Sequence, residues 1–218
     1  GNQLKGKKII ITAGPTYESI DPVRFIGNHS SGKMGFQIAE NCLKRGAEVI
    51  LVSGPTQQKL KHDNLTLINV TSAEEMFLAV QNHFKTCDGG IFAAAVSDYR
   101  PTDVADQKIK KSDETMTLTL TKNPDILLWA GQHKSEKQWL IGFALETNDA
   151  LAHAAKKLKK KNLDAIVVNT LEDKGAGFGF DTNKITILDL NNNSTNFELT
   201  SKKEAAKNIL DFITNNLV

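Results

Sequence analysis

The chain has 218 residues, of which 40% are hydrophobic and 24% charged, a composition typical of one large globular domain. Its formal net charge of +2 is too small to indicate nucleic-acid or membrane binding through bulk electrostatics. The sequence contains no apolar run of about 18 residues and no apolar signal core near residue 1, so we expect a cytoplasmic protein.

Six short runs rich in apolar and β-branched residues predict strands, at 8–12, 48–52, 66–70, 90–94, 139–143 and 164–168. Apolar residues on both faces are typical of parallel strands covered by helices. Helical spacing at 36–43 and capping boxes at 72–75 (SAEE) and 201–204 (SKKE) predict helices between and after the strands. This order predicts an α/β fold: a doubly wound, Rossmann-like, mostly parallel sheet with helices on both faces.

One segment departs from this order. Residues 108–121 read KIKKSDETMTLTLT, and in the second half Met116, Leu118 and Leu120 alternate with threonines. Such alternation predicts a two-faced strand in a β-ribbon excursion beside the main sheet. Residues 184–190 and 196–200, joined by NNNS, predict a hairpin. We therefore expect a single domain over residues 1–218.

The cysteines and histidines indicate no metal or redox centre. Cys42 and Cys87 lack C-x-x-C spacing, so we expect two reduced, buried or half-buried thiols. The five histidines form no pair with metal-ligand spacing.

Residues 27–35 (GNHSSGKMG) come close to a phosphate-binding P-loop, with Gly27, Gly32 and Lys33 in place. Met34, however, stands where the motif needs a hydroxyl, and about fourteen residues, predicted as a long loop, separate the first strand from Gly27. The glycine fingerprint of dinucleotide-binding proteins is also absent. We expect Ser30 or Ser31 to cap the following helix, whose N-terminus would still attract an anion.

Three further segments admit a structural or a functional interpretation. Asp98 follows the fourth predicted strand, where α/β sheets bind ligands, or is a turn aspartate. The lysines of 108–111 (KIKK) form a solvated face, or one of them points into a cleft. Asn123 begins a predicted helix as its cap, with Pro124 and Asp125 in the first turn.

The segment 148–161 predicts a basic helix whose apolar stripe is Leu151, Ala154, Ala155 and Leu158. Lys156 and Lys160 are expected to face solvent. Lys157 and Lys161 lie one turn apart at the edge of the stripe, where they would repel each other unless an anion such as a polyphosphate joined them.

Taken together, these residues resemble the phosphopantothenoylcysteine synthetase family, the ligase domain of the bacterial bifunctional coenzyme A biosynthesis flavoprotein. The matching stretches occur in family order and are ITAGPT (11–16), DPVRFIGNHSSGKMG (21–35), VSGP (52–55), AAVSDYRP (94–101), KIKK (108–111), KNPDI (122–126), GFALETN (142–148), KKNLD (160–164) and GFGFDTN (177–183). The resemblance covers residues 8–190.

The resemblance implies a ligase that uses CTP and Mg²⁺. It would activate the carboxylate of 4′-phosphopantothenate as an acyl-cytidylate, releasing pyrophosphate, and the amine of L-cysteine would then displace CMP. No protein nucleophile is needed, which agrees with the absence of a recognisable nucleophile–base set in the sequence. A preference for CTP over ATP does not follow from the residues themselves.

The resemblance also implies site residues. Asn28 is expected to handle the activated acyl group, together with Lys108 as a second catalytic residue, and Asp98 is expected to bind the metal. The expected nucleotide contacts are Ser31, Gly32, Phe92, Ala93, Ala94, Asp98, Lys108, Pro124, Asp125, Ile126, Leu127, Phe143, Lys157 and Lys161. A homodimer is expected, with the ribbon around 108–121 at the interface.

In most bacteria this family's ligase domain follows a flavin-dependent decarboxylase in the same polypeptide. The short leader GNQLKG favours an excised domain over a stand-alone enzyme, and no bound FMN is expected. Two alternatives stay open: an NAD-type oxidoreductase on the same fold, and a nucleotide sensor without turnover. The oxidoreductase would need a glycine fingerprint and an acid after the second strand, whereas the sensor would tolerate loss of Asn28.

Overall fold

The structure, a computed structural model, describes residues 1–147, 149–170 and 181–218. Asn148 and residues 171–180 lie outside the described residues. They include the first residue of the predicted basic helix and four residues of the stretch 177–183.

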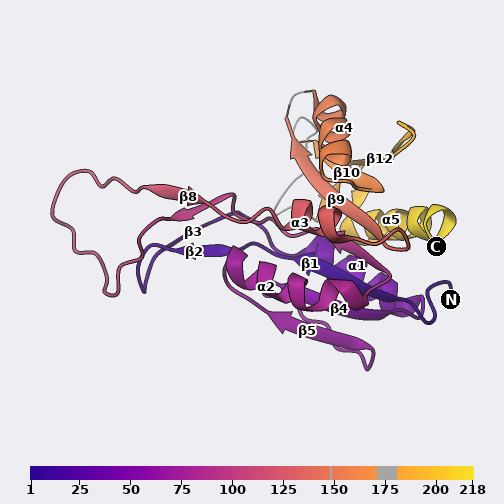
Figure 1. Ribbon diagram of the computed structural model, residues 1–218, viewed down its shortest axis with the longest axis horizontal. Coiled ribbons are helices and arrows are strands. Elements are labelled where there is room, and N and C mark those ends of the chain that lie inside the picture. Colours follow the sequence, from indigo (N-terminus) through magenta and orange to yellow (C-terminus); the bar gives the residue numbers. More distant parts are fainter. Residues whose placement is uncertain (148, 171–180) are drawn as a thin grey trace.

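In the described part of the chain the fold is built on an eight-stranded sheet with the order β13-β12-β10-β9-β6-β1-β4-β5 (Figure 1). The strands are β1 (Lys8–Ala13), β4 (Glu48–Ser53), β5 (Leu65–Asn69), β6 (Gly89–Phe92), β9 (Trp139–Glu146), β10 (Ala165–Thr170), β12 (Ile185–Asp189) and β13 (Ser194–Asn196). Neighbours from β5 to β10 pair in parallel, whereas β12 and β13 are antiparallel. The predicted mostly parallel sheet is confirmed. The C-terminal hairpin is confirmed as well, but its second strand is Ser194–Asn196 and not the predicted 196–200.

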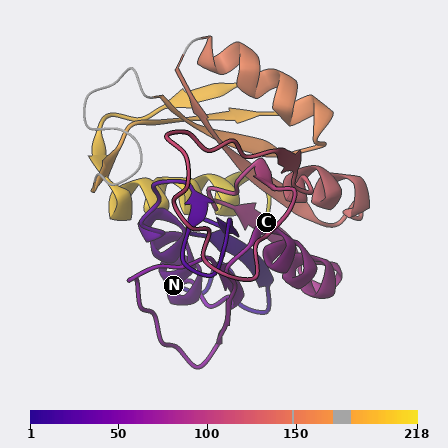
Figure 2. The same ribbon diagram turned by 90° about the vertical axis from the view of Figure 1, so that its left-hand side faces the viewer.

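Helices cover both faces of this sheet (Figure 2). Helices α1 (Lys33–Lys44) and α5 (Lys202–Asn216) bury their apolar sides in one core, together with residues of β1, β4 and β12. Helices α2 (Ala73–His83), α3 (Ile126–His133) and α4 (Ala150–Lys160) pack in a second core on the other face, and a short 3-10 helix, η1 (Phe84–Thr86), follows α2. Doubly wound packing is therefore confirmed.

Both cysteines lie in these cores as free thiols, as predicted. Burial raises the pKa of Cys42 to about 12 and that of Cys87 to about 11. Neither thiol is therefore ionised near neutral pH, and neither is suited to act as a nucleophile.

Helix α1 lies unusually close to β1 because Gly35 has no side chain. A Cβ atom at Gly35 would overlap the Cβ of Ala13, the last residue of β1. The contact places the N-terminus of α1 directly beside the carboxyl end of the central strand. Gly35 therefore allows α1 to pack closely against β1, although glycine itself is a poor helix former.

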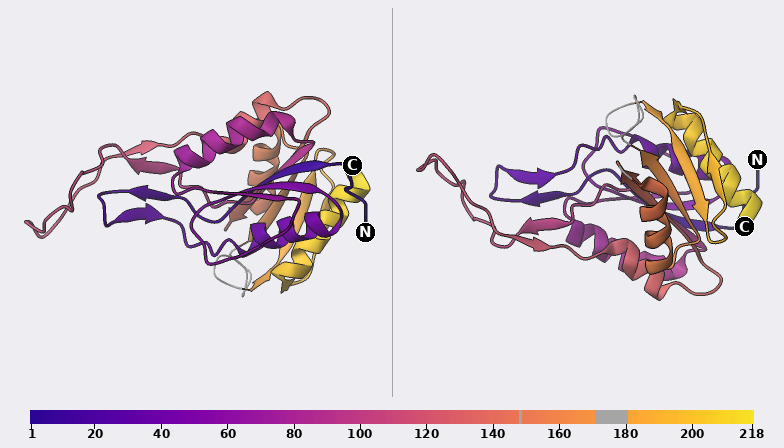
Figure 3. Two further views of the ribbon diagram at one scale, coloured as in Figure 1. Left: turned by 90° about the horizontal axis from the view of Figure 1, so that it is seen from below. Right: turned by 90° about the horizontal axis from the view of Figure 1, so that it is seen from above.

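Two short antiparallel pairs project from the carboxyl edge of the sheet (Figures 1 and 3). One pairs β2 (Tyr17–Ser19) with β3 (Phe25–Gly27), and the other pairs β7 (Tyr99–Pro101) with β8 (Leu120–Lys122). We call them, with residues 102–119 between β7 and β8, the arm. A third small pair, β11 (Thr182–Asn183) with β14 (Thr200–Ser201), lies at the start of α5.

The arm corrects two predictions. The segment between β1 and Gly27 is not a plain loop, because it contains the β2–β3 hairpin. The alternating run at 108–121 forms a strand only at Leu120–Lys122. Of its alternating apolar residues, Met116 is 54% exposed and Leu120 42%, and Leu118 is only half-buried. Alternation without a buried face does not stabilise a strand.

Replacing Gly35 with Ala should destabilise the protein by about 1–3 kcal/mol, because the added methyl group overpacks the contact with Ala13. Helix propensity alone predicts the opposite sign, since Ala is the better helix former by about 1 kcal/mol. Urea unfolding measures the difference, with Gln37→Ala on the same helix as the control. A Gly35→Ala variant as stable as the wild type would contradict the close packing.

Candidate functional site

The carboxyl ends of β1 and β6 form a topological switch point. After β1 the chain continues to β4 and β5 on one side, and β6 then adds to β1 on the other side. Open α/β sheets bind ligands at such a point. Two adjoining cavities lie there, cavity 1 of about 370 Å³ and cavity 2 of about 640 Å³. Both volumes are typical of small-molecule sites.

The two cavities share four residues: Ala94, Val96, Asp98 and Phe143. Three of them belong to the segment that follows β6, and Phe143 lies on β9. The amides of Ala93 and Ala94 donate to the backbone oxygen and to Oγ1 of Thr12, at 3.0 and 3.3 Å, which fixes the segment to β1. A ligand in either cavity therefore reaches the same short wall.

Cavity 1 lies at the start of α1. It is lined by Gly14, Asn28, residues 30–35, 93–96, Asp98, 143–145, Asn169, Asn183 and Lys202. The N-cap of α1 is Gly32, whose φ of 80° is left-handed and suits glycine. The first intrahelical bond joins the amide of Phe36 to the carbonyl of Gly32, so the amides of Met34 and Gly35 precede it and face outward.

The predicted serine cap is wrong. Neither Ser30 nor Ser31 caps α1. The Oγ of Ser30 accepts from the amide of Gly32 and the Oγ of Ser31 from that of Lys33, both at 3.3 Å. These local bonds bend the chain into the left-handed turn at Gly32. The P-loop interpretation stays rejected, because the β2–β3 hairpin separates β1 from this turn and Met34 packs against the core.

Asn28 reaches across to the shared wall. Its Nδ2 donates to the carbonyl oxygens of Ala95 and Val96, at 3.1 and 3.5 Å. Asn28 itself is exposed and lines cavity 1. The residue therefore lies beside the junction of the two cavities, where a group held between them would meet its carboxamide.

Cavity 1 is also lined by two lysines, Lys33 and Lys202, which were not among the predicted binding residues. Lys33 donates to the Oδ1 of Asp181 at 2.6 Å, which holds the pKa of that carboxyl below its usual value. Lys202, the first residue of α5, is only 4% exposed. Burial lowers the pKa of its ammonium, Asp181 opposes this shift, and Lys33 adds to it.

Cavity 2 contains most of the predicted nucleotide contacts: Phe92, Ala94, Asp98, Pro124, Asp125, Ile126, Leu127, Phe143, Lys157 and Lys161. Ser31, Gly32 and Ala93 line only cavity 1. Lys122 and Lys160 add two further lysines to cavity 2. Lys160 is exposed, as predicted, and it also lines this cavity.

The expected repulsion between Lys157 and Lys161 is relieved within the chain. Lys157 donates to Glu146 at 2.9 Å, and Lys161 lies 3.1 Å from Asp125. Burial opposes the charge of Glu146, but Lys157 and His153 outweigh it and lower the pKa of the carboxyl. Leu151 was placed in the apolar stripe of α4, yet it is 45% exposed.

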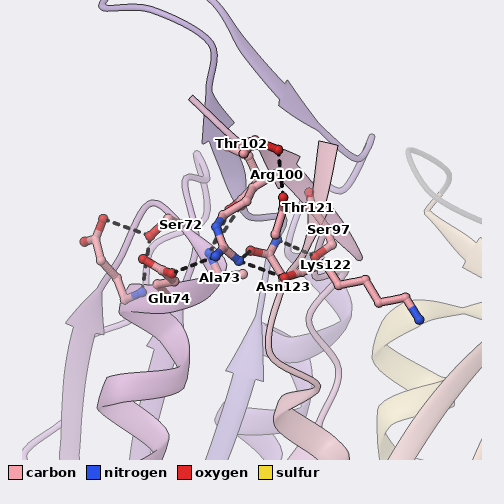
Figure 4. A network of polar contacts seen from close by, with 11 residues as sticks. Ser72, Ala73, Glu74, Ser97, Arg100, Thr102, Thr121, Lys122 and Asn123 are labelled. Atoms are coloured by element: carbon pink, nitrogen blue, oxygen red, sulfur yellow. Dashed lines mark hydrogen bonds and ion pairs between the residues drawn. The ribbon is translucent and has the colours of Figure 1, made fainter. Parts of the chain in front are cut away.

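The wall of cavity 2 is fixed by polar contacts at the base of the arm (Figure 4). Arg100 donates to the carbonyl of Lys122 at 2.8 Å and to the Oδ1 of Asn123 at 3.1 Å, and it approaches Glu74 of α2 at 3.5 Å. Asn123 donates to the carbonyl of Ser97 at 2.8 Å. Asn123 is therefore not the cap of α3: the cap is Asp125, whose Oδ1 accepts from the amide of Leu128.

Asp98 is the predicted metal ligand, and it is exposed to both cavities. Among the described residues no group of three or more His, Cys, Asp or Glu side chains is arranged to hold a metal ion. Mg²⁺ in nucleotide sites usually takes one or two carboxylates together with phosphate oxygens. Asp98 and Asp125 both line cavity 2 and fit that pattern.

Lys108 lines neither cavity and is exposed on the arm. Its neighbour Ile109 is clamped to the β2–β3 turn, where its amide donates to the Oδ2 of Asp21 at 3.0 Å and its carbonyl accepts from Arg24 at 2.7 Å. The structure of a single chain thus does not bring Lys108 to the other predicted site residues.

Asn169, Asn183 and Lys202 line cavity 1 but were not predicted as site residues. Asn169 directly follows the predicted strand 164–168. This position was the available signal, since polar side chains past the carboxyl end of a strand are ligand candidates. Asn183 and Lys202 reach the site only through the pairing of β11 with β14, which local sequence patterns do not reveal.

Comparisons with known proteins agree with this architecture. Residues 4–217 match the family described as DNA/pantothenate metabolism flavoprotein C-terminal domain. The chain is 48% identical over 207 residues to a protein named cysteine/cysteine sulfinic acid decarboxylase from an unknown prokaryotic organism, covering 95% of this chain and 58% of that protein. It is 46% identical over 210 residues to the coenzyme A biosynthesis bifunctional protein CoaBC of Bacillus subtilis, covering 96% of this chain and 52% of that protein.

A crystal structure of the C-terminal domain of CoaBC superposes with a TM-score of 0.84 at 43% identity, covering 99% of this chain and 97% of that one. The chain therefore belongs to the family of C-terminal domains of DNA/pantothenate metabolism flavoproteins. It spans between half and three fifths of the two curated relatives. Within the described residues, every helix is too short or too polar to cross a membrane.

The ionised carboxyl group of Asp21 binds Arg24 and the amide of Ile109, and so it fixes residue 109 of the arm to the β2–β3 turn. The Arg24 side chain, against the opposing effect of burial, and the amides of Ile109, Arg24 and Val23 lower the pKa of Asp21 far below 3.8. A carboxyl with a lowered native pKa stabilises the fold fully above its unfolded pKa and loses that effect as the pH falls through the native value. The clamp is therefore expected to persist throughout the neutral and mildly acidic range.

Replacing Asp21 with Asn should release Ile109 at neutral pH. Hydrogen exchange at one fixed pH should show faster exchange of the Ile109 amide, with Asp103→Asn, an exposed arm residue, as the control. In the wild type, an NMR titration of Asp21 should give a midpoint below 3.8. A titration midpoint of Asp21 at or above 3.8 would refute the clamp. Unchanged hydrogen exchange of the Ile109 amide in Asp21→Asn would refute it as well.

Proposed function

We propose that this chain is a phosphopantothenate–cysteine ligase that uses CTP. The observation that carries the proposal is the pair of adjoining cavities at the switch point, one basic and one at a helix N-terminus, with Asp98 facing both. A reaction that joins a nucleotide to an acid needs two such compartments with one common wall. The relatives named coenzyme A biosynthesis bifunctional protein support the substrate class.

CTP is assigned to cavity 2, the larger of the two. Lys122, Lys157, Lys160 and Lys161 give it the positive charge that a triphosphate needs. Lys157 and Lys161 exchange their carboxylate partners for phosphate oxygens when the nucleotide binds. Asp98, with Asp125 in the same cavity, would hold Mg²⁺, which would neutralise charge on the phosphates.

The acid is assigned to cavity 1, with its carboxylate at the wall shared with cavity 2. We therefore reassign Ser31 and Gly32, expected as nucleotide contacts, to the acid. The carboxylate oxygen attacks the α-phosphorus of CTP, a P–O bond forms, and the bond to the pyrophosphate oxygen breaks. The cysteine amine then attacks the acyl carbon and loses a proton, and the C–O bond to CMP breaks.

Asn28 positions and stabilises the acyl group. Its Nδ2 donates to the carbonyl oxygens of Ala95 and Val96 at the shared wall. During the reaction one of its N–H groups donates instead to the acyl oxygen as negative charge develops there. Because the donor serves mainly the transition state, its loss affects turnover more than nucleotide affinity.

We further propose a homodimer formed through the arm. Six apolar side chains of the arm are exposed: Val23, Phe25, Tyr99, Val104, Met116 and Leu120. Such a surface is costly on a monomer and typical of an interface. A partner's arm also brings Lys108, which lines neither cavity of its own chain, to the nucleotide site of the other subunit.

The central assay is pyrophosphate release. The wild type should release pyrophosphate with CTP and phosphopantothenate and form the amide when cysteine is added. Asn28→Ala should lower kcat by about a hundredfold, as loss of one oxyanion donor typically does, with little change in the KM for CTP. Pyrophosphate release that does not depend on phosphopantothenate, or none at all, would refute the ligase, and full turnover of Asn28→Ala would refute the role of Asn28.

The dimer is tested by sedimentation. Met116→Glu together with Leu120→Glu should yield monomers and low activity, because two charges are placed in an apolar interface. Leu190→Glu, an equally exposed apolar residue remote from the arm, is the control. Active monomers of the double variant would contradict both the interface and the assignment of Lys108 to a partner's site.

A further inference from the structure

One buried carboxylate takes no direct part in the proposed chemistry. Glu18 is only 2% exposed, although it belongs to β2, a strand of the projecting arm. It lines neither cavity. Burial of a carboxylate is costly unless hydrogen bonds compensate for it. A charged side chain in this position therefore indicates a specific contact.

That contact is with the start of α2. The carboxylate oxygens of Glu18 accept from the amide of Ala73, the first residue of α2, at 3.2 and 3.5 Å. An amide in the first turn has no acceptor within its own helix, and the positive end of the helix dipole favours a negative charge there. The amide of Tyr17 donates to the carbonyl of Thr71 at 2.7 Å. Glu18 and Tyr17 thus attach β2 to the residues at which α2 begins.

The direction of the arm depends on polar contacts of this kind at its base. Val23 and Phe25 are 63% and 50% exposed, and both antiparallel pairs project from the sheet (Figure 3). In the second pair, Arg100 of β7 approaches Glu74 of α2 (Figure 4). The start of α2 therefore contacts both pairs of the arm. Hydrogen bonds to a carboxylate are directional, so they fix an orientation as well as a contact.

The β2–β3 pair connects Glu18 to Asn28. Glu18 lies opposite Ile26, and Tyr17 lies opposite Gly27, the residue that precedes Asn28. The pair is tightly packed at this point, since a Cβ atom at Gly27 would lie 2.7 Å from the ring of Tyr17. A movement of β2 at Glu18 therefore moves Asn28 as well.

We propose that Glu18 is a positioning residue for the ligase reaction: its bond to the start of α2 fixes β2, and β2 holds the carboxamide of Asn28 at the wall shared by the two cavities. The proposal rests on the ligase function proposed above. Because Glu18 lines neither cavity, it contacts neither the nucleotide nor the acid. It acts through Asn28, whose donor serves the transition state, so its loss lowers turnover and leaves nucleotide affinity unchanged.

Glu18→Met removes both carboxylate oxygens and keeps the length of the side chain. It should lower kcat for amide formation by about tenfold, with no change in the KM for CTP, because a small misplacement of a reacting group slows the chemical step. Glu18→Gln retains an oxygen that accepts from Ala73 and should keep most of the activity. Glu75→Ala is the control and should leave kcat unchanged, since Glu75 belongs to the same helix start but bonds to Ser72.

A double-mutant cycle tests the route of the effect. If Glu18 acts through Asn28, Glu18→Met should cause no further loss of kcat in a protein that already carries Asn28→Ala. Thermal unfolding verifies that each variant is folded at the temperature of the assay. Losses that multiply in the double variant would overturn the positioning role, because a general structural effect does not depend on Asn28.

Ala73→Pro breaks the same bond from the other side and replaces Glu18→Met if that variant fails to fold. Proline has no N–H, suits the first residue of a helix and needs an extended residue before it. Ser72 meets this need, with φ −100° and ψ 165°. The variant should lower kcat as Glu18→Met does, again with no further loss beside Asn28→Ala. Full turnover of either folded variant would overturn the proposal.

The outcome for the proposed function is distinguishable. A wild type that releases no pyrophosphate with CTP and phosphopantothenate refutes the ligase and the role of Glu18 with it. A wild type that turns over normally, with Glu18→Met equal to it, refutes only the role of Glu18.

Discussion

The site depends on how closely α1 lies on β1. Gly35 has no side chain that would hold the helix away from Ala13. Gly32, whose φ angle is left-handed, allows the chain to turn into the helix at the edge of the sheet. The N-terminus of α1 therefore lies beside the segment after β6, and the side chain of Asn28 donates a hydrogen bond to the carbonyl of Ala95 in that segment. A helix displaced outward by a methyl group would separate the amides of α1 from the wall that the two cavities share.

Much of the architecture follows from sequence. Apolar runs such as 48–52 and the boxes at Ser72 and Ser201 are local signals, and the sheet and helices confirm them. The arm was misjudged because its strands are only three residues long and have no buried face, so periodicity carries little information there. The cap at Asp125 was displaced from Asn123 because Arg100 and Ser97, distant in sequence, engage Asn123 instead.

Asp98 was predictable as a site residue because it follows the fourth predicted strand, whereas Phe143 and the start of α3 were expected from the family resemblance. All of them line cavity 2. Lys202 and Asn183 were not predictable, because only the pairing of β11 with β14 brings them to cavity 1. Burial then gives them properties their types do not suggest: a lysine that is 4% exposed and a carboxamide oxygen without a donor.

The division of labour between the cavities is the central claim: nucleotide in cavity 2, acid in cavity 1, and chemistry at the shared wall of Ala94, Val96, Asp98 and Phe143. A crystal structure with CTP and Mg²⁺ bound tests it most directly. The account predicts the triphosphate beside Lys157 and Lys161, with the α-phosphate facing the shared wall. A triphosphate bound instead at the N-terminus of α1, against Gly32 and Lys33, would contradict it.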